Sequence, residues 1–437
     1  MTILKRISRT KLYWGLIAIF VVGVIWSPLT GSGKNIFLSY GNLLDVLRQV
    51  STTGLIATGM TAVIITGGID LSVGSVMAIC TVVCAMLLTV PGATPAALLG
   101  IPALCLAVMI VISVTVRFIF SNLEKAKAGE GERRDLQLGP VRGIALPAIA
   151  AVAACTLLLV FLLPQVGTKF GVIGVLLVAP AVGLLFGSIN GLIIVVGRLQ
   201  PFIVTLAMMV TALGIARLTA GQNNAVLPVY TGSNAVEEFD TLRSLAFGII
   251  PIPGLFFIAA ILIYAIVLKF TPFGRYVYAI GGNEEAARLS GIDAVKVKVV
   301  TYAMSGLLAG VAAVLYVAQY RQGKPDAGAG LELDAIAAVV IGGTSLMGGR
   351  GSLAGTFCGV LIFGLLSNIL QLHNINSNLQ LVLKGLIIIG TVVVQERNAG
   401  ELFARLRLLG ARPTAKPTAE ERSSTESLSL NLGGNKK

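Results

Sequence analysis

The sequence predicts an all-α polytopic membrane protein, and two observations carry that prediction. The 437 residues are 55% hydrophobic and only 12% charged, and the mean hydropathy is +0.89. Apolar runs of about 18 to 25 residues recur along the chain, which is the length that an α-helix needs to cross a bilayer. Runs such as GLIAIFVVGVIW at 15–26 lack the alternation of transmembrane barrel strands, so helices are expected.

Taken in order, these runs predict about twelve spans. The first follows a basic N-terminus but has no convincing cleavage site, so we expect a retained span rather than a signal peptide. The tenth run is short for a full crossing, and a re-entrant segment is the alternative. The predicted spans are 12–29, 43–66, 72–90, 97–120, 143–163, 171–197, 202–220, 253–270, 298–319, 334–347, 352–371 and 378–394.

The loop charges predict an orientation for these spans. Lysine and arginine gather at 5–11, 117–142 and 269–298, and alternating spans place all three groups on one side. Because basic loops favour the cytoplasm, both termini are expected there. The net charge of +13 follows from this bias; no basic stripe with interleaved aromatics is present, so no nucleic-acid partner is expected.

Two domains are predicted, a transmembrane domain at 1–396 and a cytoplasmic tail at 397–437. The tail is polar and contains proline and a serine-rich end. It is expected to begin as a basic amphipathic helix at 402–409 on the membrane surface and then to become disordered.

The stretch 281–298, GGNEEAARLSGIDAVKVK, is a charged island between two apolar runs. Asn283 is expected to cap a helix of one or two turns that starts with Glu284 and Glu285 and stops at Gly291. A solvated loop helix and a docking helix that transmits motion from a cytoplasmic engine both fit these residues.

The stretch TGGIDLSVGSVMA at 66–78 joins two of the predicted spans. Its two glycines break the first span, and Asp70 or Ser72 is expected to cap the helix that follows. The alternative is that Asp70 lies on a conduction or coupling route, because ionisable groups inside a membrane are costly and usually functional. Its place near the cytoplasmic edge favours the capping role.

The sequence contains no motif that indicates enzyme catalysis. The glycine-rich run 333–355 continues Gly348-Gly349-Arg350, without the lysine that a phosphate-binding loop requires, so its glycines are expected to allow close helix packing or a broken helix. His373 is the single histidine, and the five cysteines fall in apolar runs without metal-site spacing. We therefore expect no catalytic residues, no metal and no cofactor on this chain.

Four motifs give the chain a resemblance to a known family. TGGIDLSVGS, QPFIVTLAMM (200–209), GRYVYAIGGNEEAARLSGI (274–292) and LELDAIAAVVIGGTSLMGGRGS (331–352) resemble, in the same order, the permease subunits of ribose/xylose/galactoside-type bacterial ABC importers. The resemblance covers roughly 36–90 and 170–396 and implies a core of about ten spans. Residues 92–168 then form an inserted two-span hairpin with a cytoplasmic loop at 121–142.

The resemblance implies a homodimeric multi-pass pore in the lipid of the bacterial inner membrane. A separate cytoplasmic ABC ATPase would bind ATP–Mg, and an extracytoplasmic sugar-binding protein would deliver the solute. Transport would proceed by alternating access. The implied ATPase-coupling helix consists of Gly282, Asn283, Glu284, Glu285, Ala286, Ala287, Arg288 and Gly291.

Four polar side chains inside predicted spans are candidate pathway residues: Gln49, Asn190, Asn368 and Gln371. Hydrogen bonding between helices is the alternative for each. The expected solute is a monosaccharide or a related small polyol, with a nucleoside or autoinducer-like sugar as close variants. An ion-coupled secondary carrier of a small polar solute is the competing function, and a scaffold without transport is a third. The acidic residues lie at span edges or in loops, which argues against ion coupling.

Overall fold

The computed structural model describes residues 2–89, 171–221 and 225–396. The predicted spans 97–120 and 143–163, the predicted insertion 92–168 and the tail 397–437 lie outside these residues. The chain divides into one unit at Met1–Ile388 and another at Ile389–Lys437. The contacts described below lie within the first unit; helix α14 begins in the first unit and ends in the second.

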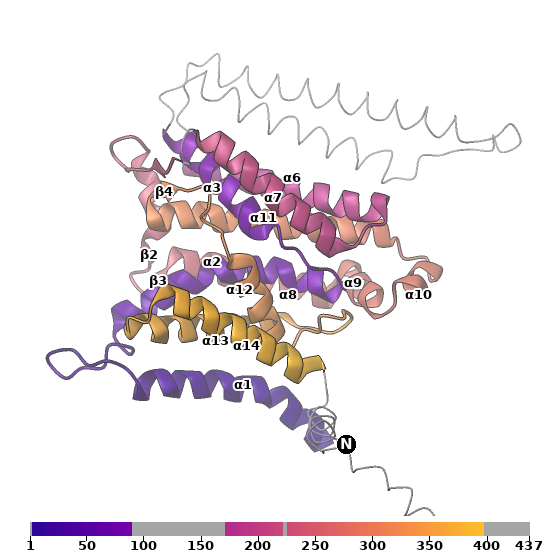
Figure 1. The fold of residues 1–437 in the computed structure, drawn as a ribbon, viewed down its shortest axis with the longest axis horizontal. Coiled ribbons are helices and arrows are strands. Elements are labelled where there is room, and N and C mark those ends of the chain that lie inside the picture. The colour runs from indigo at the N-terminus through magenta and orange to yellow at the C-terminus, as the bar shows by residue number, and fades with distance from the viewer. Residues whose placement is uncertain (1, 90–170, 222–224, 397–437) are drawn as a thin grey trace, which may run out of the picture. The chain divides into compact units, whose positions relative to one another are not determined.

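Helices make up most of the described structure (Figure 1). The helices are α1 (Thr2–Ile25), α2 (Tyr40–Ile65), α3 (Val73–Thr89), α6 (Val172–Gly197), α7 (Pro201–Ala220), η3 (Glu237–Arg243), α8 (Ile252–Phe270), α9 (Pro272–Gly282), α10 (Glu284–Leu289), α11 (Ala294–Tyr320), α12 (Leu331–Ile341), α13 (Leu353–Leu372) and α14 (Ser377–Glu396). The short strands are β1 (Leu227–Pro228), β2 (Leu245–Ala246), β3 (Ile250–Pro251) and β4 (Gln322–Gly323). Antiparallel pairs form between β1 and β4 and between β2 and β3.

The predicted spans that fall on described residues all correspond to helices. Five helices there, α6, α7, α8, α11 and α13, are long and apolar enough to cross a membrane. Helix α12 has 11 residues, about 16 Å at 1.5 Å per residue, against a hydrocarbon core of about 30 Å. It is therefore too short to cross alone, as the tenth apolar run indicated.

One helix was missing from the sequence prediction. Residues 272–282 form α9, which precedes α10 and was treated as loop. Pro272 occupies the first turn, and the Thr271 side chain accepts a hydrogen bond from the Gly274 N–H. A threonine cap followed by proline is a helix-start signal that the sequence does contain.

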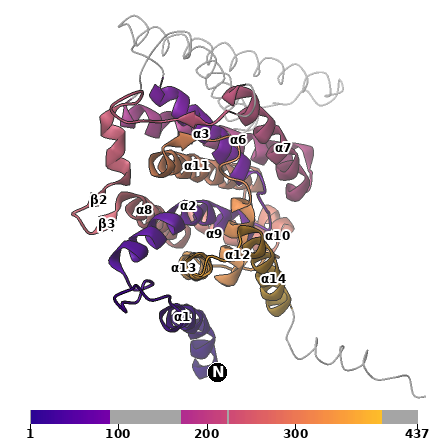
Figure 2. The same cartoon turned by 60° about the vertical axis from the view of Figure 1, so that its left-hand side comes forward.

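The centre of the unit is α11, which packs against α6, α2 and α3 in both views (Figures 1 and 2). Its contact with α6 depends on glycines spaced four residues apart, Gly183, Gly187 and Gly191. A Cβ atom at Gly187 would lie 2.2 Å from the Tyr302 carbonyl oxygen, and one at Gly183 would lie 2.1 Å from that of Gly306. The two backbones therefore approach as closely as small-residue helix contacts in membranes allow.

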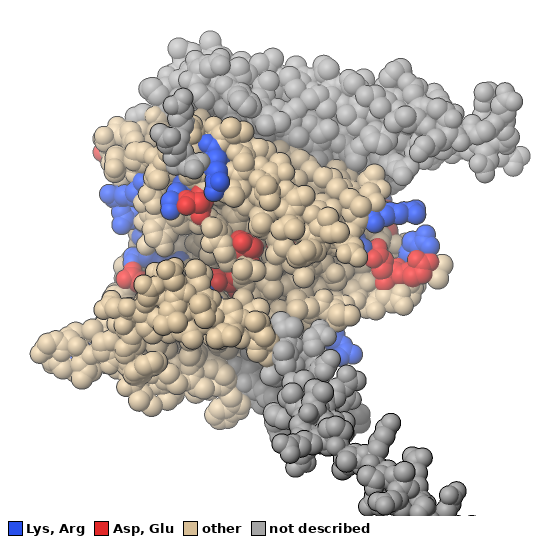
Figure 3. Space-filling model, viewed as in Figure 1, with Lys and Arg blue, Asp and Glu red and all other residues tan. Residues whose placement is uncertain are grey.

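Charged side chains gather at two ends of the unit and leave a largely uncharged band between them (Figure 3). Helix α10 lies at one of these ends, together with the N-terminal end of α1, whereas β2 and β3 lie at the other (Figure 1). This distribution fits a protein embedded in a bilayer, with the uncharged band in the hydrocarbon.

Candidate functional site

Helix α10 forms as the sequence predicted. The Asn283 side chain accepts a hydrogen bond from the Ala286 N–H at 2.9 Å, which caps the helix. Gly291 follows with φ +83°, a left-handed conformation that glycine adopts without strain. The N-cap, the helix and the glycine stop are all confirmed.

Residues of α10 form two ion pairs. The Arg288 guanidinium donates to both carboxylate oxygens of Glu285, at 3.2 and 2.6 Å, and these bonds hold the pKa of Glu285 below its usual value and raise that of Arg288. Lys298 Nζ lies 2.6 Å from Glu284 and links α10 to the start of α11. The Glu285–Arg288 pair is exposed and lies within α10, so it adds little stability, whereas the Glu284–Lys298 pair connects α10 to α11.

The two faces of α10 differ in their surroundings. Ala287 is buried against the rest of the unit, whereas Leu289 is 79% exposed at the end of the helix. The exposed face thus offers one large apolar side chain beside the carboxylates of Glu284 and Glu285 and the guanidinium of Arg288. Such a mixture of apolar and charged groups suits contact with another protein.

Three chain segments meet next to α10 through their backbones. The Gly349 N–H donates to the carbonyl oxygen of Ile65, at the end of α2, at 2.8 Å. A Cβ atom at Gly281, at the end of α9, would overlap that same oxygen. Both Gly348 and Gly349 have positive φ. The glycine-rich stretch after α12 therefore provides close packing, and Gly348 lies there against Gly67 and Gly281, so three of the sequence motifs meet.

Asp70 and Ser72 form a buried junction between α3, α6 and α11. Asp70 accepts hydrogen bonds from the Ser72 N–H at 3.0 Å and the Ser72 hydroxyl at 2.7 Å, and from the Ser305 hydroxyl at 3.1 Å. Asn190 donates to the Ser72 hydroxyl at 2.8 Å. The carboxylate thus binds the residue just before α3 and a side chain of α11, and no first-turn N–H of α3 is among these contacts.

A cavity of about 530 Å³ lies between α2, α11, α12, α13 and α14. Two of the predicted pathway residues, Gln49 and Gln371, line it. Asn368 instead exchanges hydrogen bonds with Asn42 at 3.1 and 2.8 Å, and Asn190 lies in the Asp70 junction. The structure therefore brings two of the four candidates together at a cavity and places the other two at helix contacts.

The same cavity contains an ion pair that sequence reasoning missed. Asp334 of α12 and Lys384 of α14 lie 2.7 Å apart, and Lys384 Nζ also lies 5.2 Å from the centre of the Phe363 ring. Lys384 is an isolated charge within an apolar run, and Asp334 follows Glu332 at the start of another; charges in such runs mark functional candidates.

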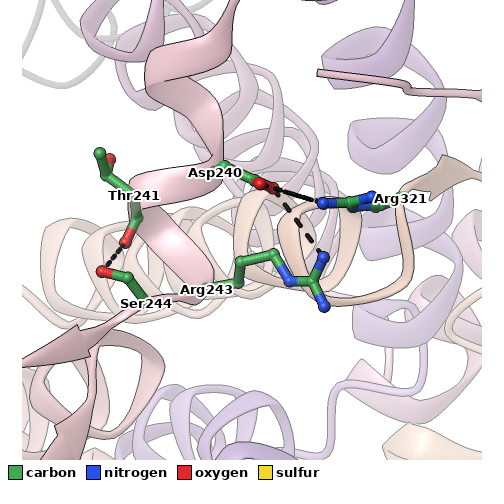
Figure 4. Close-up of polar contacts among 5 residues, drawn as sticks. All are labelled: Asp240, Thr241, Arg243, Ser244 and Arg321. Carbon is green, nitrogen blue, oxygen red and sulfur yellow. Dashed lines mark hydrogen bonds and ion pairs between the residues drawn. The ribbon is translucent and has the colours of Figure 1, made fainter. Parts of the chain in front are cut away.

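At the opposite end of the unit, η3 is tied to α11. Arg321, which follows α11, donates to both carboxylate oxygens of Asp240 at 3.0 and 3.1 Å, and Arg243 lies 3.9 Å from the same carboxylate (Figure 4). The β1–β4 pair joins Leu227 to Gly323 nearby. The described segment between α7 and α8 is therefore anchored to the end of the central helix.

Comparison with known proteins identifies the family. A family model described as "Branched-chain amino acid transport system / permease component" matches residues 42–125 and 141–392. The ribose import permease protein of Escherichia coli K12 is 34% identical over 389 residues, covering 87% of this chain and 92% of that protein. The ribose import permease protein of Bacillus subtilis 168 is 35% identical, with 88% and 92% covered.

A third relative is the fructose import permease protein of Bifidobacterium longum, which is 29% identical with 92% of each chain covered. No solved structure matches the chain. The family match and the full-length relatives confirm the resemblance that the four motifs gave. The chain belongs to the family of transport-system permease components, and it is a membrane transport subunit rather than an enzyme.

Proposed function

We propose that this chain is the permease subunit of an ATP-driven importer for a monosaccharide in the bacterial inner membrane. The similarity to two ribose import permeases over seven-eighths of the chain carries the proposal. The fructose import permease supports the same class of solute. An ion-coupled carrier lacks this support, because the family consists of permease components of transport systems.

The proposed architecture is a homodimer in lipid, each chain with about ten core spans, an inserted hairpin at 92–168 and both termini in the cytoplasm. The position of α10 at the same end as the start of α1 supports this orientation (Figure 1). ATP–Mg is bound by a separate cytoplasmic ATPase, and a sugar-binding protein docks on the other side, where η3 is anchored.

The proposed coupling element is α10, with Glu284, Glu285, Arg288 and the exposed Leu289 facing the ATPase. Closure of the ATPase on ATP moves α10, and the backbone contacts of Gly281 and Gly349 with Ile65 pass that movement to α2. Because α2 lines the cavity, a shift of this helix changes access to it. Gln49 and Gln371 are the pathway residues that we propose. For Asn190 and Asn368 we propose a role in helix packing, which their hydrogen bonds support.

Reconstitution with the cognate ATPase and binding protein tests this function. We expect Arg288→Glu and Leu289→Asp to abolish co-purification of the ATPase and solute-stimulated ATP hydrolysis. Arg243→Glu, which reverses the same kind of exposed charge at the other end, is the matched control for assembly and should leave co-purification of the ATPase intact.

Two results would contradict the proposal. Unchanged assembly and hydrolysis in both α10 variants would remove α10 as the coupling element. Uptake that persists without ATP and collapses with an uncoupler would identify an ion-coupled carrier instead.

A further inference from the structure

The charged groups that line the cavity cancel one another. Four ionisable acidic or basic side chains are among its lining residues in the described part of the chain, two acids and two bases. Asp334 pairs with Lys384 at 2.7 Å, and Asp45 pairs with Arg48 at 2.9 Å. The cavity therefore carries no net charge from these groups.

The two pairs differ in exposure. The Asp334 and Lys384 side chains are only 17% and 19% exposed, whereas the Asp45 side chain is 69% exposed. Removing one partner of a poorly hydrated pair leaves the other charge without compensation, which is costly. Arg48 is 22% exposed, but its partner Asp45 is well hydrated, so Asp334–Lys384 is the cavity pair in which both charges are poorly hydrated.

The remaining lining groups suit a neutral solute with many hydroxyls. Gln49, Gln319 and Gln371 each offer an amide that both donates and accepts hydrogen bonds. The rings of Tyr316 and Tyr320 lie with their centres 4.5 Å apart and give an aromatic wall for the C–H face of a sugar ring. A volume of about 530 Å³ is within the range of small-molecule sites.

We propose that this cavity is a sugar-binding site within the permease, and that the Asp334–Lys384 pair makes it selective for neutral polyhydroxyl solutes over sugar acids. The proposal rests on the proposed function and deepens it. A neutral sugar places hydroxyls against both the carboxylate and the ammonium, which accept and donate respectively. A sugar acid brings a charge that the site compensates only by breaking the pair.

The preference should shift towards the sugar acid when the carboxylate is removed and further away from it when the ammonium is removed. In Asp334→Asn, Lys384 keeps its ammonium without a carboxylate partner and becomes a site for an anion. In Lys384→Met, the Asp334 carboxylate repels an anion further. The exchanged variant Asp334→Lys with Lys384→Asp restores a neutral pair and should restore the wild-type preference.

Ligand-observed NMR on the purified full-length protein in lipid nanodiscs tests the proposal, with ribose and its acid ribonate as a matched pair of probes. Wild type should bind ribose and show weaker contact with ribonate. Asp334→Asn should raise the ribonate-to-ribose affinity ratio about tenfold, as expected for one charge-assisted hydrogen bond. The control is Asp326→Asn, which breaks an exposed pair with Lys324 outside the cavity lining and should leave the ratio unchanged.

The proposal is overturned if Asp334→Asn leaves the ratio unchanged, or if Asp326→Asn moves it equally. It is also overturned if the wild-type protein binds ribonate and ribose with equal affinity, or binds neither. This measurement uses only the wild-type protein, so it does not depend on whether a variant folds. Failure of the proposed function has a separate signature, the absence of ATP-driven ribose uptake by the wild-type complex.

Discussion

At the scale of single residues, Asp70 shows why a carboxylate is kept inside an apolar protein. It is 1% exposed and receives hydrogen bonds from one N–H and two hydroxyls, those of Ser72 and Ser305. Burial of a carboxylate without such donors would be prohibitive. The donors come from the segment before α3 and from α11, so the side chain fixes where α3 begins relative to the central helix.

Replacing Asp70 should separate the loss of the acceptor from the loss of the charge. Asp70→Ala leaves three donors without an acceptor and should cost about 2 kcal/mol or more of stability. Asp70→Asn keeps one oxygen for Ser72 and offers an N–H to the Ser305 hydroxyl, so it should cost less. Thermal unfolding of the purified protein measures both, with the exposed Asp326→Ala as control; an asparagine variant as unstable as the alanine variant would show that the charge itself is required.

At the scale of elements, the α6–α11 contact depends on the absence of side chains. The glycines of α6 face carbonyl oxygens and Cα atoms of α11, and Gly310 of α11 in turn faces Pro180 of α6. Without a hydrophobic driving force between helices in lipid, such close approach provides much of the van der Waals attraction that holds them together. The two helices therefore behave as one rigid pair.

Opposite effects are expected from one substitution at two glycines. Gly187→Ala places a methyl group 2.2 Å from the Tyr302 carbonyl oxygen, so the helices must separate at a cost of about 1–3 kcal/mol. Gly214→Ala on α7 meets no atom within 4 Å and should stabilise that helix by up to about 1 kcal/mol through its higher helix propensity. Unfolding midpoints of the two variants should move in opposite directions, and a shared direction would contradict the packing argument.

At the scale of the whole molecule, the charged ends define an orientation in the membrane. The α10 end carries Glu284, Glu285, Arg288 and Lys298, and the other end carries Asp240, Arg243 and Arg321. Local charge alone does not say which end is cytoplasmic, because both contain bases. The charge bias summed over all loops predicts that the α10 end is cytoplasmic.

Cysteine labelling should settle the orientation. In a chain whose native cysteines are replaced by serine, Ser290→Cys after α10 should react with a membrane-impermeant thiol reagent only from the cytoplasmic face. Ser233→Cys, exposed in the segment between β1 and η3, should react only from outside. Labelling of both from one face would show that the assigned topology is wrong.

The sequence predicted those features that depend on neighbouring residues. Apolar runs gave the helices at the predicted spans on described residues, although α1 begins at Thr2 rather than at 12 and α12 ends at Ile341 rather than at 347. The chemistry of Asn283 and Gly291 gave both ends of α10, because caps act over one turn. The sequence could not predict the Asp334–Lys384 pair, because the two residues lie fifty positions apart. Only the packing of α12 against its neighbours brings them together. The four-residue spacing of Gly183, Gly187 and Gly191 was visible, but the partner helix was not.

The backbone contacts beside α10 have a genetic consequence. In the proposed coupling mechanism, side chains on α10 meet the ATPase, whereas the link from α10 to α2 runs through the main chain of Ile65, Gly281 and Gly349. Loss-of-function alleles should therefore fall into two classes. Changes on α10 are open to suppression by compensating changes in the ATPase gene, whereas changes at Gly281 or Gly349 leave assembly intact and find no suppressor in the partner.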